Sequence, residues 1–193
     1  MNVTEAGMLS INVLGKLSGR DLEDALWHIG LNLHQYSLSD RTTFIEYIRN
    51  NIDKIPPATL FRCIGYLMPT YFSCMTKIEK QLYLNILIDL EIDCHTTNLS
   101  DLFDMIGILF KVAPNSSRDG LLSIIFRNSD CTGDPSTIIS LCNAFRFIFL
   151  EVDLSARLTI LEILESIRKA NQFDFLTGSI VHTIESLSVL LES

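Results

Sequence analysis

The sequence predicts an all-α protein, a right-handed α-solenoid of about four to five stacked helical hairpins. Apolar residues recur at three- and four-residue spacing along most of the chain, and no long segment alternates with period two. The pair Ile-Gly recurs inside apolar runs, at Ile29-Gly30, Ile64-Gly65 and Ile106-Gly107. Small residues also recur at intervals that each hold two helices of ordinary length, as in arrays of helical hairpins.

The composition indicates a large core or an apolar contact surface. The 193 residues suit a single domain or one continuous array. Apolar residues make up 48% of the chain, which argues against disorder. A mean hydropathy of +0.29 is high for a free soluble protein. Part of the apolar surface is therefore expected to meet a partner unless the core is unusually large.

The first part of the chain is predicted to contain a short lead-in and two helices. Residues 1–17 form an N-terminal cap, and residues 18–193 form a single helical-repeat domain. Ser18 and Asp21 have the spacing of a capping box at the start of the first helix. The buried stripe of that helix is Leu22, Ala25, Leu26, Ile29 and Leu33. Ser39 or Asp40 opens a second helix, which ends before Pro56 and Pro57.

The middle of the chain is predicted to hold four further helices. Pro57 suits the first position of a helix that contains LFRCIGYLM. Thr76 and Glu79 form a second capping box, which opens the next helix. A helix led by Ser100 contains LFDMIGILFKV, and a short helix over 118–127 follows it, weakened by Gly120.

The last part of the chain is predicted to hold three helices after a turn-rich stretch at 128–136. Asp134 caps the first of them, with Pro135 at its first position. Residues 154–170 form the longest helix, and the last helix covers 179–191.

Small residues within alternate helices are predicted to mark a structural repeat. The markers recur at intervals of 35 to 42 residues and are Gly30, Gly65, Gly107, Ala144 and Ser186. A small side chain lets neighbouring helix backbones approach closely, and stacked hairpins then share one long core. The alternative is a leucine-rich helical bundle in which five irregular helix pairs align by chance.

The charge distribution disfavours nucleic acid and provides one candidate surface. The net charge is −8, and the 15 Lys and Arg residues are scattered along the chain. Scattered cations of this kind are poorly suited to binding the phosphates of a nucleic-acid backbone. No basic residue lies between Lys80 and Lys111. The acidic residues in that interval are Asp89, Glu91, Asp93, Asp101 and Asp104. They form either a solvated acidic face or a docking patch for a basic protein.

No pattern of catalytic, cofactor-binding or metal-binding residues emerges, and none is expected. His28 and His34 are six residues apart and point to different sides of a helix. Cys94 and His95 would need two further metal ligands from elsewhere. Trp27 lies in an apolar run and is predicted to belong to the core, not to stack on a base.

Cysteine usage and the N-terminus indicate an intracellular, reducing compartment. The five Cys residues are odd in number and form no CxxC motif. The N-terminus has no basic region and carries Glu5 early, so it resembles neither a secretory signal nor an intact transit peptide. The longest apolar run, 138–150, is too short and too polar to span a membrane.

The apolar hairpins of 35 to 42 residues, without a tight consensus, resemble the repeats of organellar helical-repeat proteins over residues 20–191. The nearest pattern is the heptatricopeptide type of RAP and FAST-kinase-like proteins. The chain lacks the Trp, Gly, Tyr and Pro pattern of tetratricopeptide repeats and the TPLHxA motif of ankyrin repeats. The resemblance implies RNA binding or a structural role in a mitochondrial ribonucleoprotein assembly.

Two functional hypotheses follow. The first is a non-enzymatic scaffold that binds other protein subunits of a larger assembly, such as a mitochondrial ribosome or another mitochondrial complex. The alternative is an RNA-binding helical-repeat protein in organellar RNA metabolism, which the acidic charge disfavours. An enzyme is the third and least favoured class, because the sequence shows no catalytic motif.

Overall fold

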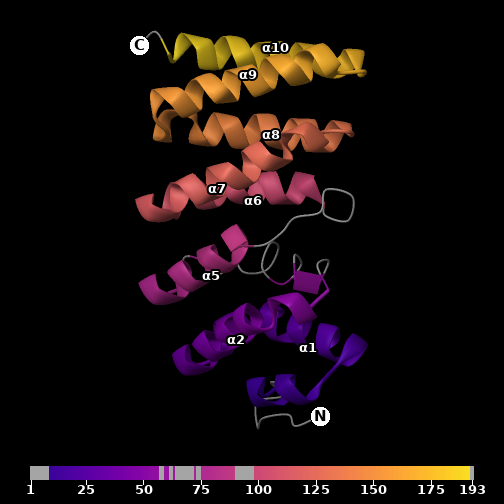
Figure 1. Cartoon of the computed structure of the whole chain (residues 1–193), viewed down its shortest axis with the longest axis vertical. Helices are drawn as coiled ribbons and strands as arrows, with labels where there is room; N and C mark the ends of the chain where they lie inside the picture. Colours follow the sequence, from indigo (N-terminus) through magenta and orange to yellow (C-terminus); the bar gives the residue numbers. More distant parts are fainter. Residues whose placement is uncertain are drawn as a thin grey trace. The chain divides into compact units, whose positions relative to one another are not determined.

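The computed structural model describes residues 9–56, 59, 60, 63, 72, 75–89 and 98–191 (Figure 1). These residues form α-helices joined by short 3-10 turns, and no strand occurs among them, which confirms the predicted all-α class. In the same residues, no helix combines the length and the apolarity that crossing a bilayer requires. The chain divides into two compact units, Met1–Thr97 and Asn98–Ser193.

Unit 1 contains three described α-helices with 3-10 turns before and after them. In chain order its elements are η1 (Ile11–Lys16), α1 (Gly19–Leu31), η2 (Leu33–Gln35), α2 (Leu38–Asn50), η3 (Ile52–Lys54) and α5 (Lys77–Asp89). The predicted stripe of α1, together with Leu33 of η2, is buried. The expected helix that begins at Pro57 lies mostly outside the described residues, as does Gly65.

Two predictions about helix starts in unit 1 need correction. Ser18 is the N-cap of α1, but its side chain makes no capping hydrogen bond. The first helical residue, Gly19, has φ 54, outside the helical region, so the capping-box geometry does not form there. The N-cap of α2 is Ser37, earlier than predicted, and its hydroxyl accepts a hydrogen bond from the backbone N–H of Asp40.

The capping box at the start of α5 is confirmed, and it links α5 to α2. The backbone N–H of Thr76 donates to Oε2 of Glu79 at 2.8 Å, and the N–H of Glu79 donates to the Thr76 hydroxyl at 3.3 Å. Nε of Arg41, in α2, donates to the other carboxylate oxygen of Glu79 at 2.8 Å. Only 1% of the Glu79 side chain is exposed, so α2 and α5 share a buried ion pair.

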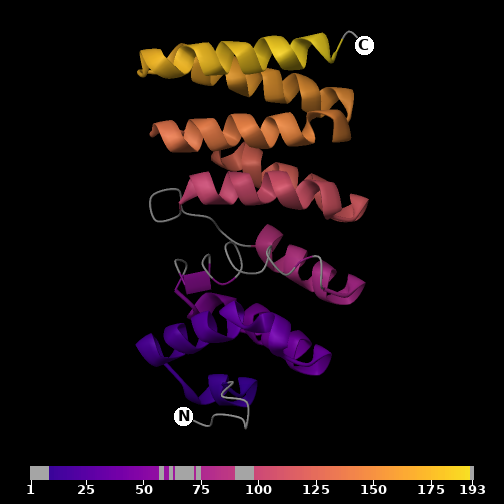
Figure 2. The ribbon, with the colours of Figure 1, turned by 180° about the vertical axis from the view of Figure 1, so that it is seen from behind.

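Unit 2 contains five α-helices in two layers. Its elements are α6 (Leu99–Val112), α7 (Asn115–Asn128), η6 (Ser129–Cys131), α8 (Pro135–Ile148), η7 (Phe149–Glu151), α9 (Leu154–Ala170) and α10 (Asp174–Val189). Within this unit, α6, α8 and α10 follow one another in one layer, and α7 and α9 lie in the other (Figures 1 and 2). The core between the layers is rich in Phe, Leu and Ile.

Most predicted elements of unit 2 are confirmed. Asp134 caps α8 with Pro135 in the first turn, and α9 covers the predicted residues. The helix α7 is longer than predicted, because its buried side chains outweigh the weak helix preference of Gly120. The last helix begins at Asp174 and not near Ser179, so the predicted start was wrong.

The close packing expected at small residues is confirmed where α6 meets α8. A Cβ atom added to Gly107 would lie 3.1 Å from Cα of Ala144 and 3.3 Å from Cδ2 of Phe147. The two helix backbones therefore approach as closely as glycine allows. Gly30 is buried in α1.

The marker predicted at Ser186 stays a prediction. Ser186 is only half-buried, and its hydroxyl donates within α10, to the carbonyl of His182. One contact between α10 and α8 involves the fully buried Thr183, whose hydroxyl accepts a 2.7 Å hydrogen bond from Nη2 of Arg146. Thr183 is one helical turn from Ser186 on the same helix.

A cation recurs at the fourth position of four described helices, α2, α5, α7 and α9. These residues, which we call the recurring cations, are Arg41, Lys80, Arg118 and Arg157, spaced 38 or 39 residues apart. In three cases the cation lies over the ring of a phenylalanine eight residues earlier. Lys80 is 5.1 Å from the ring centre of Phe72, Arg118 is 5.4 Å from that of Phe110, and Arg157 is 5.7 Å from that of Phe149.

Backbone contacts accompany the two cation–ring pairs of unit 2. Nε of Arg118 donates to the carbonyl of Ala113, and Nε of Arg157 donates to that of Val152, in each case five residues earlier. Arg41 has the buried Leu33 eight residues before it in place of a ring. The four helices that carry the cations begin at Leu38, Lys77, Asn115 and Leu154. In unit 2, Arg118 and Arg157 therefore share both the ring contact and the backbone contact. In unit 1, among the described residues, Lys80 shares the ring contact and Arg41 shares the position along its helix.

Candidate interaction surfaces

The predicted acidic patch is only partly described by the structure. Asp89 is exposed at the end of α5, in unit 1. Glu91 and Asp93 lie outside the described residues. Asp101 and Asp104 are on α6, in unit 2. The docking role of these five carboxylates therefore remains a prediction.

The two patch residues on α6 also have structural contacts. Nδ2 of Asn98 donates to Oδ2 of Asp101 at 2.9 Å, and the backbone N–H of Asp101 donates to Oδ1 of Asn98, so Asp101 helps to cap the helix. The hydroxyl of Ser140, in α8, donates to Oδ2 of Asp104 at 2.9 Å. The hydroxyls of Ser140 and Ser100 are 2.8 Å apart. Asp104 therefore helps to hold α6 against α8 while it remains exposed to solvent.

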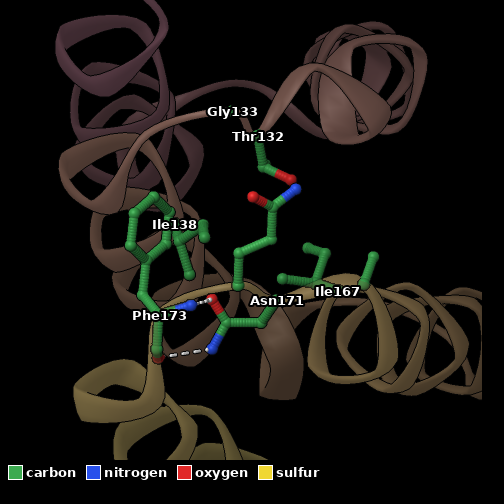
Figure 3. Close-up of a pocket in the computed structure, with 8 residues that line it drawn as sticks. Thr132, Gly133, Ile138, Ile167, Asn171 and Phe173 are labelled. Carbon is green, nitrogen blue, oxygen red and sulfur yellow. Dashed lines mark hydrogen bonds between the residues drawn. The ribbon is translucent and has the colours of Figure 1, made fainter.

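A small hollow lies where two loops of unit 2 meet. It has a volume of about 100 Å³ and is lined by Thr132, Gly133, Ile138, Ile167, Ala170, Asn171, Gln172 and Phe173. Figure 3 shows Thr132 and Gly133 opposite Asn171 and Ile167. The side chain of Asn171 accepts a hydrogen bond from the N–H of Phe173 and donates another to its carbonyl, which holds the loop before α10 in place.

A second hollow adjoins the first and shares Thr132, Ile167 and Ala170 with it. Its volume is about 270 Å³, and Asp130 and Glu162 are among its lining residues. Both hollows are smaller than the roughly 300–1,000 Å³ typical of small-molecule sites. They also lack a group of His, Cys, Asp and Glu residues suited to a metal, as does the rest of the described structure.

Three of the five cysteines lie among the described residues. Cys63 and Cys142 are buried, as predicted from their apolar surroundings in the sequence, and Cys131 is half-buried. Burial raises the pKa of Cys142, which keeps its thiol protonated and unreactive near neutral pH. Cys74, Cys94 and His95 lie outside the described residues.

The prediction that Trp27 belongs to the core was wrong. Its side chain is 37% exposed, because Trp27 lies about 100° around α1 from the buried Leu26. Glu23 and Asp24 lie four and three residues before it, on the same side of the helix. The spacing of these three residues indicates that they share one side of the helix. The apolar run around Trp27 led instead to its assignment to the core.

Trp27 borders a hollow in unit 1 that is lined by two carboxylates. The hollow has a volume of about 250 Å³, and the described residues around it are Glu23, Asp24, Trp27, Thr59 and Cys63. The Thr59 hydroxyl donates to Oε2 of Glu23 at 3.0 Å and holds this carboxylate at the edge of the hollow. We call this surface the Trp27 hollow.

Comparison of the chain with protein-family models, with curated proteins and with solved structures found no match.

Proposed function

We propose that the protein is a non-enzymatic helical-repeat scaffold that joins other protein subunits in a larger assembly. The proposed architecture is a right-handed α-solenoid of about four to five helical hairpins. The observation that carries this proposal is the set of recurring cations, which occupy equivalent helix positions every 38 or 39 residues. Regular recurrence of one local arrangement is typical of stacked repeats, whose extended surfaces commonly bind other proteins.

Contacts between successive hairpins support a stacked arrangement within each unit. In unit 1, the Arg41–Glu79 pair joins residues 38 positions apart. In unit 2, Ser140 binds Asp104 across 36 positions and Arg146 binds Thr183 across 37. Contacts at nearly constant sequence separation are expected when each hairpin packs on the next.

Large apolar side chains that remain exposed support a role in protein binding. In unit 2, Leu154 and Leu158 lie one turn apart on α9, and both are largely exposed. Ile108 and Val112 are exposed in the same relation on α6. A partner that covers this surface removes apolar area from water, which stabilises the complex.

The proposed partners are proteins, because the net charge of −8 opposes binding to phosphates. The proposed setting is a reducing intracellular compartment, and the resemblance to organellar repeat proteins favours the mitochondrion. A mitochondrial ribosome or another mitochondrial complex is the kind of assembly that fits this setting.

Purification of the native protein under mild conditions tests this function. We expect it to elute in a complex of fixed stoichiometry that survives nuclease treatment. A protein that elutes as a monomer would contradict the scaffold hypothesis. Release by nuclease, together with tight RNA binding that weakens steeply with salt, would favour the RNA-binding alternative.

A further inference from the structure

The Trp27 hollow combines a tryptophan that is 37% exposed with two carboxylates. Asp24 and Trp27 are exposed on α1, and Glu23 is half-buried beside them. In the part of the chain that the structure describes, neither carboxylate forms an ion pair. The volume of about 250 Å³ is far above the roughly 15 Å³ that admits a single water molecule. The hollow is therefore large enough to receive part of a side chain from another molecule.

A cationic side chain matches the chemistry of this surface. The face of an indole attracts Arg and Lys, and more strongly than the face of a phenyl ring. Carboxylates pair with the same groups, and Arg in particular forms two parallel hydrogen bonds with a carboxylate. The Thr59 hydroxyl holds Glu23 in position before any ligand arrives, which lowers the entropy lost on binding.

The same arrangement disfavours a nucleic-acid base on Trp27. A base could stack on the indole, but its phosphates would then lie near Glu23 and Asp24. Negative phosphates need cations beside the stacking ring, and carboxylates repel them. The net charge of −8 adds a long-range attraction for basic partners and a repulsion for nucleic acid.

We propose that the Trp27 hollow is a docking site for an arginine or lysine side chain of a basic partner protein. In this proposal the cation lies over the indole of Trp27 and pairs with Glu23 and Asp24. The proposal rests on the scaffold function and adds to it a specific contact on α1 and the chemistry of the partner segment.

The chain has one tryptophan, so its fluorescence reports directly on this surface. The whole protein is titrated with a short peptide of arginine and glycine that has both ends blocked, at about 150 mM salt. The control ligand is the same peptide with glutamate in place of arginine. The test variant is Glu23→Gln with Asp24→Asn, and circular dichroism checks that it remains folded.

A matched control variant is Asp119→Asn, which removes one exposed carboxylate from α7, in unit 2. We expect saturable changes in Trp27 emission with the arginine peptide, with at least roughly fivefold weaker binding in the test variant, as the loss of two partly exposed ion pairs implies. Asp119→Asn should bind within about twofold of the unchanged protein, since rim charges distant from the contact contribute little to affinity.

Three outcomes would overturn the proposal: no saturable change with the arginine peptide, equal weakening by Asp119→Asn, or a stronger response to single-stranded RNA than to the peptide. These failures are distinct from failure of the scaffold function. A native complex that persists after a negative peptide titration would leave the scaffold function in place with another docking surface. A positive titration of a protein that is monomeric in its native state would contradict the scaffold function alone.

Discussion

The two units hold their helices together by different means. In unit 1, the described link is a buried ion pair, with 18% of Arg41 and 1% of Glu79 exposed. In unit 2, Arg118 has the equivalent position, but its partner Glu151 is 43% exposed, and the close contact of Gly107 with Ala144 brings the helices together. The ion pairs of Arg41 and Arg118 are therefore expected to contribute differently to the free energy of unfolding, because that contribution depends on burial as well as on charge.

The largest effect is expected from Arg41→Met. This change leaves the carboxylate of Glu79 buried without its cation, and the loss of one partner of a buried pair typically costs about 3–5 kcal/mol. Denaturant unfolding monitored by circular dichroism measures the loss of stability. A loss below about 1 kcal/mol would place this pair with the ordinary surface pairs.

Gly107→Leu should produce the next largest effect. The new side chain would press against the backbone of Ala144, and overpacking of this kind costs about 1–3 kcal/mol. Gly178→Leu is the matched control, since Gly178 lies in helix α10 with open space where its Cβ would be. The control should be neutral or stabilising by up to about 1 kcal/mol, because leucine favours helix more than glycine does. Equal effects of the two changes would show that α6 and α8 are not held closely together.

The stability of unit 1 should depend on acidic pH through Glu79. Burial by itself would raise the pKa of Glu79, but the hydrogen bonds from Arg41 and Thr76 outweigh it and hold the pKa below the ordinary value of 4.5. The resulting stabilisation is complete above pH 4.5 and is lost as the pH falls toward the lowered pKa of the folded state. Glu79→Gln should flatten this part of the pH profile in thermal unfolding experiments. An unchanged profile would mean that other carboxylates determine the acid sensitivity.

The smallest effect is expected from Arg118→Ala. Its pair with Glu151 is partly exposed, and its contact with the ring of Phe110 is worth about 0.5–1 kcal/mol at such a site. The total loss in denaturant unfolding should therefore stay near 1 kcal/mol. A loss as large as that of Arg41→Met would remove the proposed difference between the units.

The sequence predicted features that depend on neighbouring residues. The capping box of Thr76 and Glu79 and the bounds of α9 follow from local hydrogen bonding and helical periodicity. Gly107 was identified because a small residue inside a large apolar run has few explanations other than close packing. The all-helical class followed from the same periodicity.

Features that depend on distant residues were missed. The recurring cations lie eight residues from their rings, across a turn, so no helical period connects them. The burial of Glu79 depends on Arg41, 38 residues earlier. Trp27 was assigned to the core by its apolar neighbours, although its direction on the helix places it beside two carboxylates. These errors arise where tertiary contacts, and not local pattern, decide which face of a helix is covered.

Native-state hydrogen exchange with peptide-level resolution tests the central comparison most directly. Arg41→Met should increase exchange in α2 and α5 and leave α6 and α8 protected, since the buried pair acts within unit 1. Gly107→Leu should increase exchange in α6 and α8 and leave α2 unchanged. Equal loss of protection across both units in either variant would contradict the account, because it would show one cooperative structure in which the two kinds of link are not separate.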